Sequence, residues 1–184
     1  MRQLPTLKEL IDESAIKADQ NDLNVLLNQP PPDSWIKKHP LATGVKYIPI
    51  ERIEYLLTRL FIRWHVEVKN IQTIANSIVV VIRLHYQDRL SDQMLWQDGI
   101  GAAPIQTDKG AGAMDWNATK NDAVMKAAPA AESYAIKDAA EKIGKIFGKD
   151  INRKDTMIYD GLLGAVLRTE EKYQKLFEDD NRTT

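Results

Sequence analysis

The expected fold of this chain follows from residues 122–147, DAVMKAAPAAESYAIKDAAEKIGKIF. Apolar residues recur there at every fourth position, which is typical of a helix that buries one broad face. The stripe consists of Ala131, Ala135, Ala139, Ile143 and Phe147, with Ala128, Ile136, Ala140 and Gly144 beside it. Because most of these residues are small, the helix can approach its partner closely, and we expect that partner to be a sheet. Gly148 follows and can take the left-handed conformation that ends a helix.

The opposite face of this helix is charged and allows two interpretations. Asp138 with Lys142, and Glu141 with Lys145, are acid-before-base pairs that stabilise a solvated helix by a few tenths of a kcal/mol each. In the second interpretation, Lys142 and Lys145 form an edge of a groove and contact phosphate groups. The helix alone does not distinguish the two.

The strands are expected upstream of this helix. Pro49 suits the start of a helix over residues 50–61. From Trp64 the apolar period becomes two, and its phase slips near Asn70 as it does at a bulge. A turn at 75–76, a central strand over 78–86 and a third strand over 94–100 complete the pattern. The expected fold class is α+β, with an antiparallel meander of three or more strands packed on the long Ala-rich helix and helical extensions at both ends.

Three regions are expected along the chain. Residues 1–34 read as a helical arm that ends in the stiff connector Pro30–Pro32. Residues 35–150 form the core domain, and residues 151–184 form a helical extension with an acidic tail. We expect the core to fold without the tail.

Composition narrows the function classes. The chain has no apolar run of about 18 residues and no charged-then-apolar leader, so we expect no membrane span and a cytoplasmic protein. The absence of cysteine excludes disulfides, thiolate metal sites and cysteine nucleophiles. The net charge is −1, yet residues 35–90 hold nine basic and four acidic side chains. This distribution permits a local basic groove.

No motif supports nucleotide or metal chemistry. Residues 99–121 contain Gly99-Ile100-Gly101 and further glycines, but no P-loop lysine triplet and no strand-to-helix GxGxxG. We interpret this segment as a long flexible excursion with Lys109 and Lys120 at its rim. His65 and His85 would face each other across the first hairpin if the bulge shifts the register by one, but a third metal ligand is missing. We therefore expect neither a cofactor nor an enzyme.

The order of these elements resembles the single-strand annealing proteins of homologous recombination, of the Rad fifty-two type and its bacteriophage relatives. The best-matching stretch is AESYAIKDAAEKIGKIFG at 131–148, where Ala131, Ala135, Asp138, Phe147 and Gly148 fall on like residues. Residues 47–48, Arg52 and Trp64 match more weakly, and the resemblance covers about residues 35 to 150.

The resemblance implies a groove for single-stranded DNA between the long helix and the basic loop before the first helix. Two basic family positions fall on Lys142 and Lys145, and a third falls on Glu141, which departs from the pattern. The basic residue of the loop falls on Lys37, Lys38 or His39. The full set of expected DNA contacts is Lys37, Lys38, His39, Arg52, Lys109, Lys120, Lys142 and Lys145.

The implied function is ATP-independent binding and annealing of complementary single strands in recombination and repair, by a phage-encoded ring or filament of more than about four subunits. A single-stranded DNA-binding protein or an exonuclease, of host or phage, is the expected further partner. Three alternatives stay open: a protein that protects single strands without annealing them, a structural oligomer that does not bind DNA, and an enzyme that acts on DNA.

Overall fold

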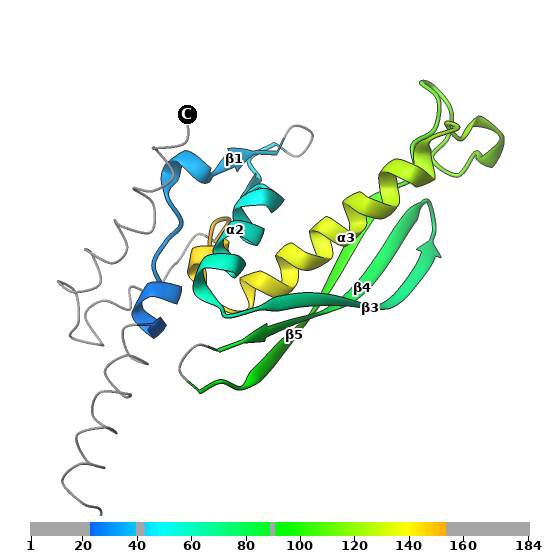
Figure 1. Cartoon of the computed structure of the whole chain (residues 1–184). Helices are drawn as coiled ribbons and strands as arrows, with labels where there is room; N and C mark the ends of the chain where they lie inside the picture. The colour runs from blue at the N-terminus through cyan, green and yellow to red at the C-terminus, as the bar shows by residue number, and fades with distance from the viewer. Residues whose placement is uncertain (1–22, 40–42, 89–90, 154–184) are drawn as a thin grey trace, which may run out of the picture.

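The computed structural model describes residues 23–39, 43–88 and 91–153 (Figure 1). Most of the expected N-terminal arm and nearly all of the C-terminal extension lie outside the described residues. The expectation that the core folds without the tail concerns residues outside this range as well. The elements are η1 (Asp33–Trp35), β1 (Lys37–Lys38), β2 (Lys46–Tyr47), α2 (Ile50–Leu60), β3 (Trp64–Ile74), β4 (Ser77–Gln87), β5 (Met94–Pro104), η2 (Trp116–Ala118), α3 (Ala123–Glu141) and η3 (Lys145–Phe147). Residues 23–27 are also helical.

The strands β3, β4 and β5 form an antiparallel sheet in the order β3-β4-β5, and α3 packs across β4 and β5. The predicted α+β meander with a long helix is confirmed. The β4 side chains at even positions, from Ile78 to Tyr86, are buried in the core under α3. The bulge lies between Val68 and Asn70, as the slip in the apolar period predicted.

Two glycines allow α3 to lie directly on β5. A Cβ added to Gly99 would stand 2.1 Å from the carbonyl oxygen of Ala135, and one added to Gly101 would stand 2.1 Å from that of Ala131. The two alanines are fully buried. The prediction that Gly99 and Gly101 open a flexible excursion was therefore wrong. They belong to β5, which continues to Pro104, because only glycine leaves room for the helix backbone.

The long helix ends earlier than its apolar stripe predicted. α3 stops at Glu141, Gly144 is extended, and η3 follows. The reason is tertiary: a Cβ on Gly144 would stand 2.4 Å from the carbonyl oxygen of Leu27, because the helical residues 23–27 cross the chain here. Gly148 takes the left-handed φ of 102° and ends η3 rather than α3.

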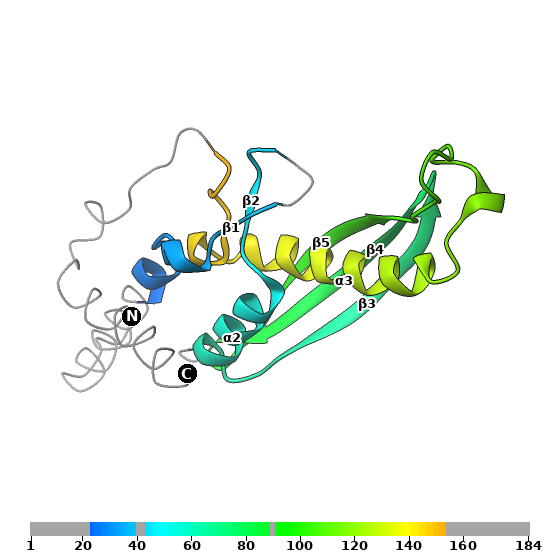
Figure 2. The ribbon, with the colours of Figure 1, turned by 90° about the horizontal axis from the view of Figure 1, so that it is seen from above.

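The core continues from the sheet into the helices around the end of α3. The buried side chains of α2, among them Leu56 and Leu57, pack in this cluster with Ile146, Phe147 and Leu27. The described part of the expected arm therefore contacts the core. Seen from above, α3 runs the length of the sheet, with the β1–β2 hairpin beside one end and the loop of residues 105–122 beyond the other (Figure 2).

Candidate nucleic-acid interface

The hairpin of β1 and β2 presents three lysines to solvent. Lys38 pairs with Lys46 and Lys37 pairs with Tyr47 in a ladder of two residues on each strand. The three lysines are exposed, and none of them forms an ion pair with another described residue. His39 is half-buried, and its ring lies edge-on to Tyr47, with the centroids 6.0 Å apart. Among the described residues, these cations therefore have no carboxylate partner.

A distant side chain holds this short hairpin in place. Asn152 Oδ1 accepts a hydrogen bond from the backbone N–H of Lys46, and Asn152 Nδ2 donates one to the carbonyl oxygen of the same residue, both at 2.8 Å. The amide therefore satisfies the outer edge of β2 as a third strand would. The backbone N–H of His39 also donates to the carbonyl of Val45 at 2.8 Å.

The hairpin meets α3 through a lysine between two tyrosines. Lys137 Nζ lies 4.9 Å from the centroid of the Tyr47 ring and 5.4 Å from that of Tyr134. Burial lowers the pKa of Lys137, while the carboxylates of Glu51 and Glu141 act in the opposite direction. The sequence placed Lys137 on the charged face of the helix but offered no reason to select it. Its contact with Tyr47 of the hairpin is what distinguishes Lys137 from the other lysines of this face.

Glu141 is largely withdrawn from solvent. Burial, with a further contribution from Asp138, raises its pKa to about 7, while Lys137, Lys142 and Arg153 lower it. At neutral pH this carboxyl is therefore protonated about half of the time. Its average negative charge at neutral pH is therefore smaller than that of an ordinary glutamate, and it weakens the positive potential of this surface less than the sequence alone suggests.

Arg52 extends the basic surface into the first turn of α2. Its guanidinium carbon lies 5.0 Å from the ring centroid of Trp35, which is buried and makes an edge contact with Tyr55. The contact with the indole holds this cation beside Trp35, two residues before β1.

Lys142 and Lys145 are engaged within the folded chain. Lys142 Nζ lies 2.9 Å from Asp138 Oδ2 and donates to the carbonyl oxygen of Asp98 at 2.6 Å, so the first predicted helix pair is confirmed. Lys145 Nζ instead pairs with Asp150 Oδ2 at 3.3 Å, and its side chain is only 12% exposed. The predicted pairing of Glu141 with Lys145 was wrong because α3 ends before Lys145.

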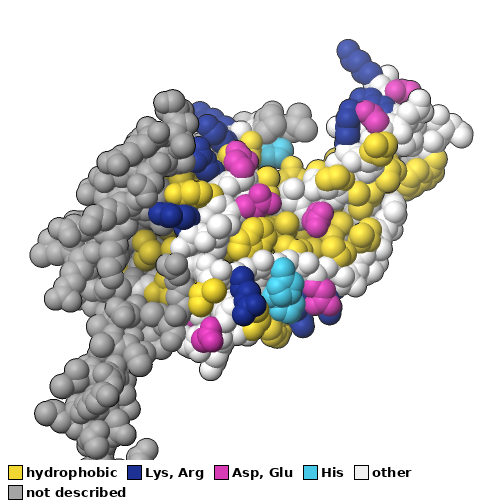
Figure 3. Space-filling view, viewed as in Figure 1, with side chains coloured by type: hydrophobic (Ala, Val, Ile, Leu, Met, Phe, Trp, Pro, Cys, Tyr) yellow, Lys and Arg dark blue, Asp and Glu magenta, His cyan; other side chains and the backbone are white. Residues whose placement is uncertain are grey.

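Lys109 and Lys120 lie at the far end of α3 from the hairpin. Both are exposed in the loop between β5 and α3, where Gly110 takes a φ of 92° and the N–H of Lys120 donates to the carbonyl of Gln106. The space-filling view shows basic side chains near β1 and, separately, at this loop end, with apolar surface between them (Figure 3). One subunit therefore does not bring the two groups together.

His65 and His85 face each other across the β3–β4 hairpin, as expected for a bulge that shifts the register by one. The bulge shifts the register by one, and His65 stacks on His85 with the centroids 4.5 Å apart. Glu67 Oε2 lies 3.2 Å from His85 Nε2. In the ranges that the structure describes, no group of three or more His, Cys, Asp or Glu side chains is placed to hold a metal ion.

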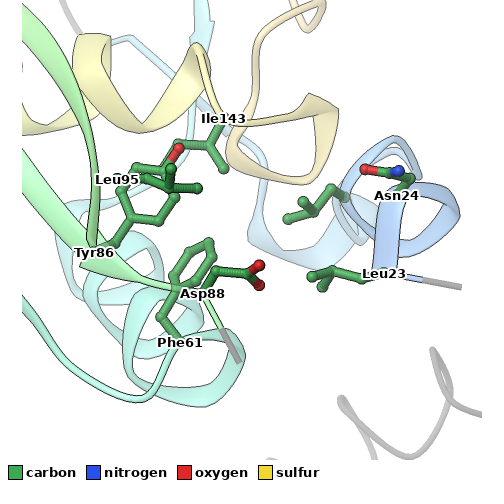
Figure 4. A pocket seen from close by; sticks show the side chains of 8 residues that line it. Leu23, Asn24, Phe61, Tyr86, Asp88, Leu95 and Ile143 are labelled. Carbon is green, nitrogen blue, oxygen red and sulfur yellow. The ribbon is translucent and has the colours of Figure 1, made fainter. Parts of the chain in front are cut away.

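One cavity of about 360 Å³ opens between the helical residues 23–27 and the ends of β4 and β5 (Figure 4). Its lining consists of Leu23, Asn24, Leu27, Phe61, Tyr86, Asp88, Leu95 and Ile143. The walls are mostly apolar, and Asp88 is the one carboxylate among them. The N–H and hydroxyl of Ser91 donate to that carboxylate. The cavity holds no pairing of a nucleophile with a base.

Neither a model of a protein family nor a curated protein sequence matches the chain. Among the helices that the structure describes, none is long and apolar enough to cross a membrane.

Proposed function

We propose that the protein binds single-stranded DNA without hydrolysing a nucleotide and anneals complementary strands in the cytoplasm, as a homo-oligomer of more than about four subunits. We place the binding surface on the β1–β2 hairpin and the adjoining face of α3. Lys37, Lys38, Lys46 and Lys137 are the proposed phosphate contacts, with Arg52 at the margin. Lys142 and Lys145 have a structural role in this proposal.

One observation carries the proposal: the three hairpin lysines, which pair with no described carboxylate, adjoin the contact of Tyr47 with Lys137 and Tyr134 of α3. Lysines that neutralise phosphates and aromatic rings that stack on bases are the usual components of a surface for single strands. The resemblance to the Rad fifty-two type annealing proteins supports the same two elements, a basic segment before the first helix and a long Ala-rich helix.

The mechanism requires no catalytic residue. Lysines that contact only phosphates fix the strand by its backbone and leave the base edges free to pair. They also lower the repulsion between two approaching backbones, because each neutralised phosphate contributes less charge. Base pairing then supplies the free energy of annealing. Many subunits are needed because one hairpin contacts only a few nucleotides.

The test reverses the charge of the hairpin. In the variant Lys37→Glu, Lys38→Glu, Lys46→Glu we expect binding of a fluorescent oligonucleotide to weaken about a hundred-fold, with a flatter salt dependence, because three cations become anions. Annealing of complementary oligonucleotides should slow in parallel. Circular dichroism checks the fold. Lys109→Glu, Lys120→Glu, which reverses two cations at the far loop, is the control for Lys37→Glu, Lys38→Glu, and both of these double variants are measured beside the triple one.

Three outcomes decide between the classes of function. A folded hairpin variant that binds and anneals like the parent contradicts the proposed surface. A parent that binds with salt sensitivity but does not accelerate pairing is a protecting protein. A parent that shows no binding at low salt has only a structural role.

A further inference from the structure

The hairpin that carries most of the proposed DNA contacts is short. β1 and β2 pair over two residues of each strand, and the N–H of His39 adds a hydrogen bond to the carbonyl oxygen of Val45 at 2.8 Å. An isolated hairpin of two strands is marginally stable at best in water. The positions of its three lysines therefore depend on contacts from outside the hairpin.

Asn152 supplies such a contact through two hydrogen bonds. Hydrogen-bonded and non-hydrogen-bonded pairs alternate along an antiparallel ladder. The pair of His39 with Val45 is hydrogen-bonded, so Lys46, one position along, directs its N–H and C=O away from β1. Asn152 accepts from this N–H and donates to this C=O, each at 2.8 Å. An asparagine amide can form both bonds because, like a peptide group, it carries an acceptor and a donor.

The turn that carries Asn152 is fixed to the core of the protein. Asp150, whose side chain is 14% exposed, forms ion pairs with Lys145 Nζ and Arg153 Nε, each at 3.3 Å. The N–H of Arg153 also donates to the carbonyl oxygen of Asp150 at 3.0 Å. Asn152 therefore joins the hairpin to a turn that a mostly buried ion pair holds in place.

We propose that Asn152 is a positioning residue of the DNA surface, which keeps the hairpin closed in the arrangement in which its lysines reach phosphates. The inference rests on the proposed function, since it concerns the same surface. Asn152 is uncharged and its amide is bonded to Lys46, so it acts on binding through the fraction of molecules whose hairpin is closed. The apparent dissociation constant for DNA rises in inverse proportion to that fraction.

Hydrogen exchange without DNA tests the positioning. The N–H of His39 is bonded within the hairpin and not to Asn152, so its exchange rate reports whether the hairpin is closed. In Asn152→Ala we expect this exchange to be about ten-fold faster than in the parent, because β2 loses two hydrogen bonds. Exchange in the buried strand β4 should be unchanged. Equal exchange rates at His39 in the two proteins overturn the proposal.

Binding of a fluorescent oligonucleotide tests the consequence for function. Asn152→Ala should weaken binding about five-fold and leave the slope of log affinity against log salt unchanged, because the closed hairpin still neutralises the same number of phosphates. The matched variant Lys46→Ala removes a cation from the residue that Asn152 holds, so it should also flatten that slope by roughly 0.7. Asn152→Leu, which neither donates nor accepts, should behave as Asn152→Ala does, and circular dichroism checks both folds.

The outcomes separate the failure of this inference from the failure of the proposed function. A parent that binds single strands, together with a folded Asn152→Ala that binds them equally well, overturns the role of Asn152 and leaves the DNA surface in place. A flatter salt slope in Asn152→Ala also overturns it, because phosphate contacts themselves would then be lost. A parent that binds no single strand overturns the proposed function and this inference with it, whatever the exchange rates are.

Discussion

Two groups of lysines differ in what surrounds their charge. Lys142 and Lys145, near the end of α3, each have a carboxylate of the same chain within ion-pair distance. Lys37, Lys38 and Lys46 on the hairpin have none among the described residues. A lysine that is already paired stabilises the fold, whereas an unpaired exposed lysine is available for a phosphate. Basic character in a sequence therefore does not by itself mark a DNA contact.

The largest effect on stability is expected at Lys145. Lys145→Glu would place a second carboxylate beside Asp150 where both side chains are mostly buried, at 12% and 14% exposure. We expect the free energy of unfolding to fall by about 3 kcal/mol, because a buried charge loses its partner and gains a like charge. Urea unfolding measures this loss.

Lys145→Met is the matched control. It keeps the apolar stem, and Arg153, whose Nε lies 3.3 Å from Asp150 Oδ1, remains beside the carboxylate, so the loss should be smaller. A loss below about 0.5 kcal/mol for Lys145→Glu would show that this lysine is not structural. Reversing Lys142 and Lys145 together would mix folding with binding, so the two residues are tested separately.

A smaller, pH-dependent effect is expected at Glu141. Its pKa rises from 4.5 to about 7 on folding, so the folded state holds more protons between these values. Its favourable contribution is therefore fully present below pH 4.5 and is lost as the pH rises to about 7. After allowance for solvent screening, we expect Glu141→Gln to be more stable than the parent by about 1 kcal/mol at pH 8 and equal to it near pH 4.

Urea unfolding across this pH range measures the difference, with the exposed Glu54→Gln as control. DNA binding above pH 7 should also strengthen in Glu141→Gln, because an anion beside Lys137 is removed. A stability difference that does not vary with pH would contradict the burial of this carboxyl.

The smallest effect is expected at Lys142. Its ion pair with Asp138 is partly exposed, so Lys142→Ala should lower the free energy of unfolding by about 0.5 kcal/mol. Binding and annealing should match the parent, because the proposed contacts lie on the hairpin. A ten-fold loss of DNA affinity in the folded variant would instead return Lys142 to the DNA surface and weaken the contrast between the two groups.

Local patterns in the sequence were enough to predict the order and type of the main elements. The four-residue stripe of Ala131, Ala135 and Ala139 predicted the buried face of α3, and the period of two with its slip near Asn70 predicted β3 and its bulge. These features depend on residues only a few positions apart. A helix repeats every 3.6 residues and a strand every two in any fold, so the spacing of apolar residues is enough to predict them. The concentration of basic residues around Lys37 could be predicted too, because it is a property of the local sequence.

Contacts between distant segments set which lysines are paired and which glycines are packed. Asn152 holds Lys46 across 106 positions of sequence, and Leu27 leaves Gly144 no room for a side chain. In the sequence Gly99 and Gly101 were interpreted as loop residues. In the structure they are strand residues against which the backbone of α3 packs. The spacing of apolar residues does not predict contacts between distant segments, because the chain topology determines those contacts. The contacts of Lys137 and Lys145 therefore emerged only from the folded chain.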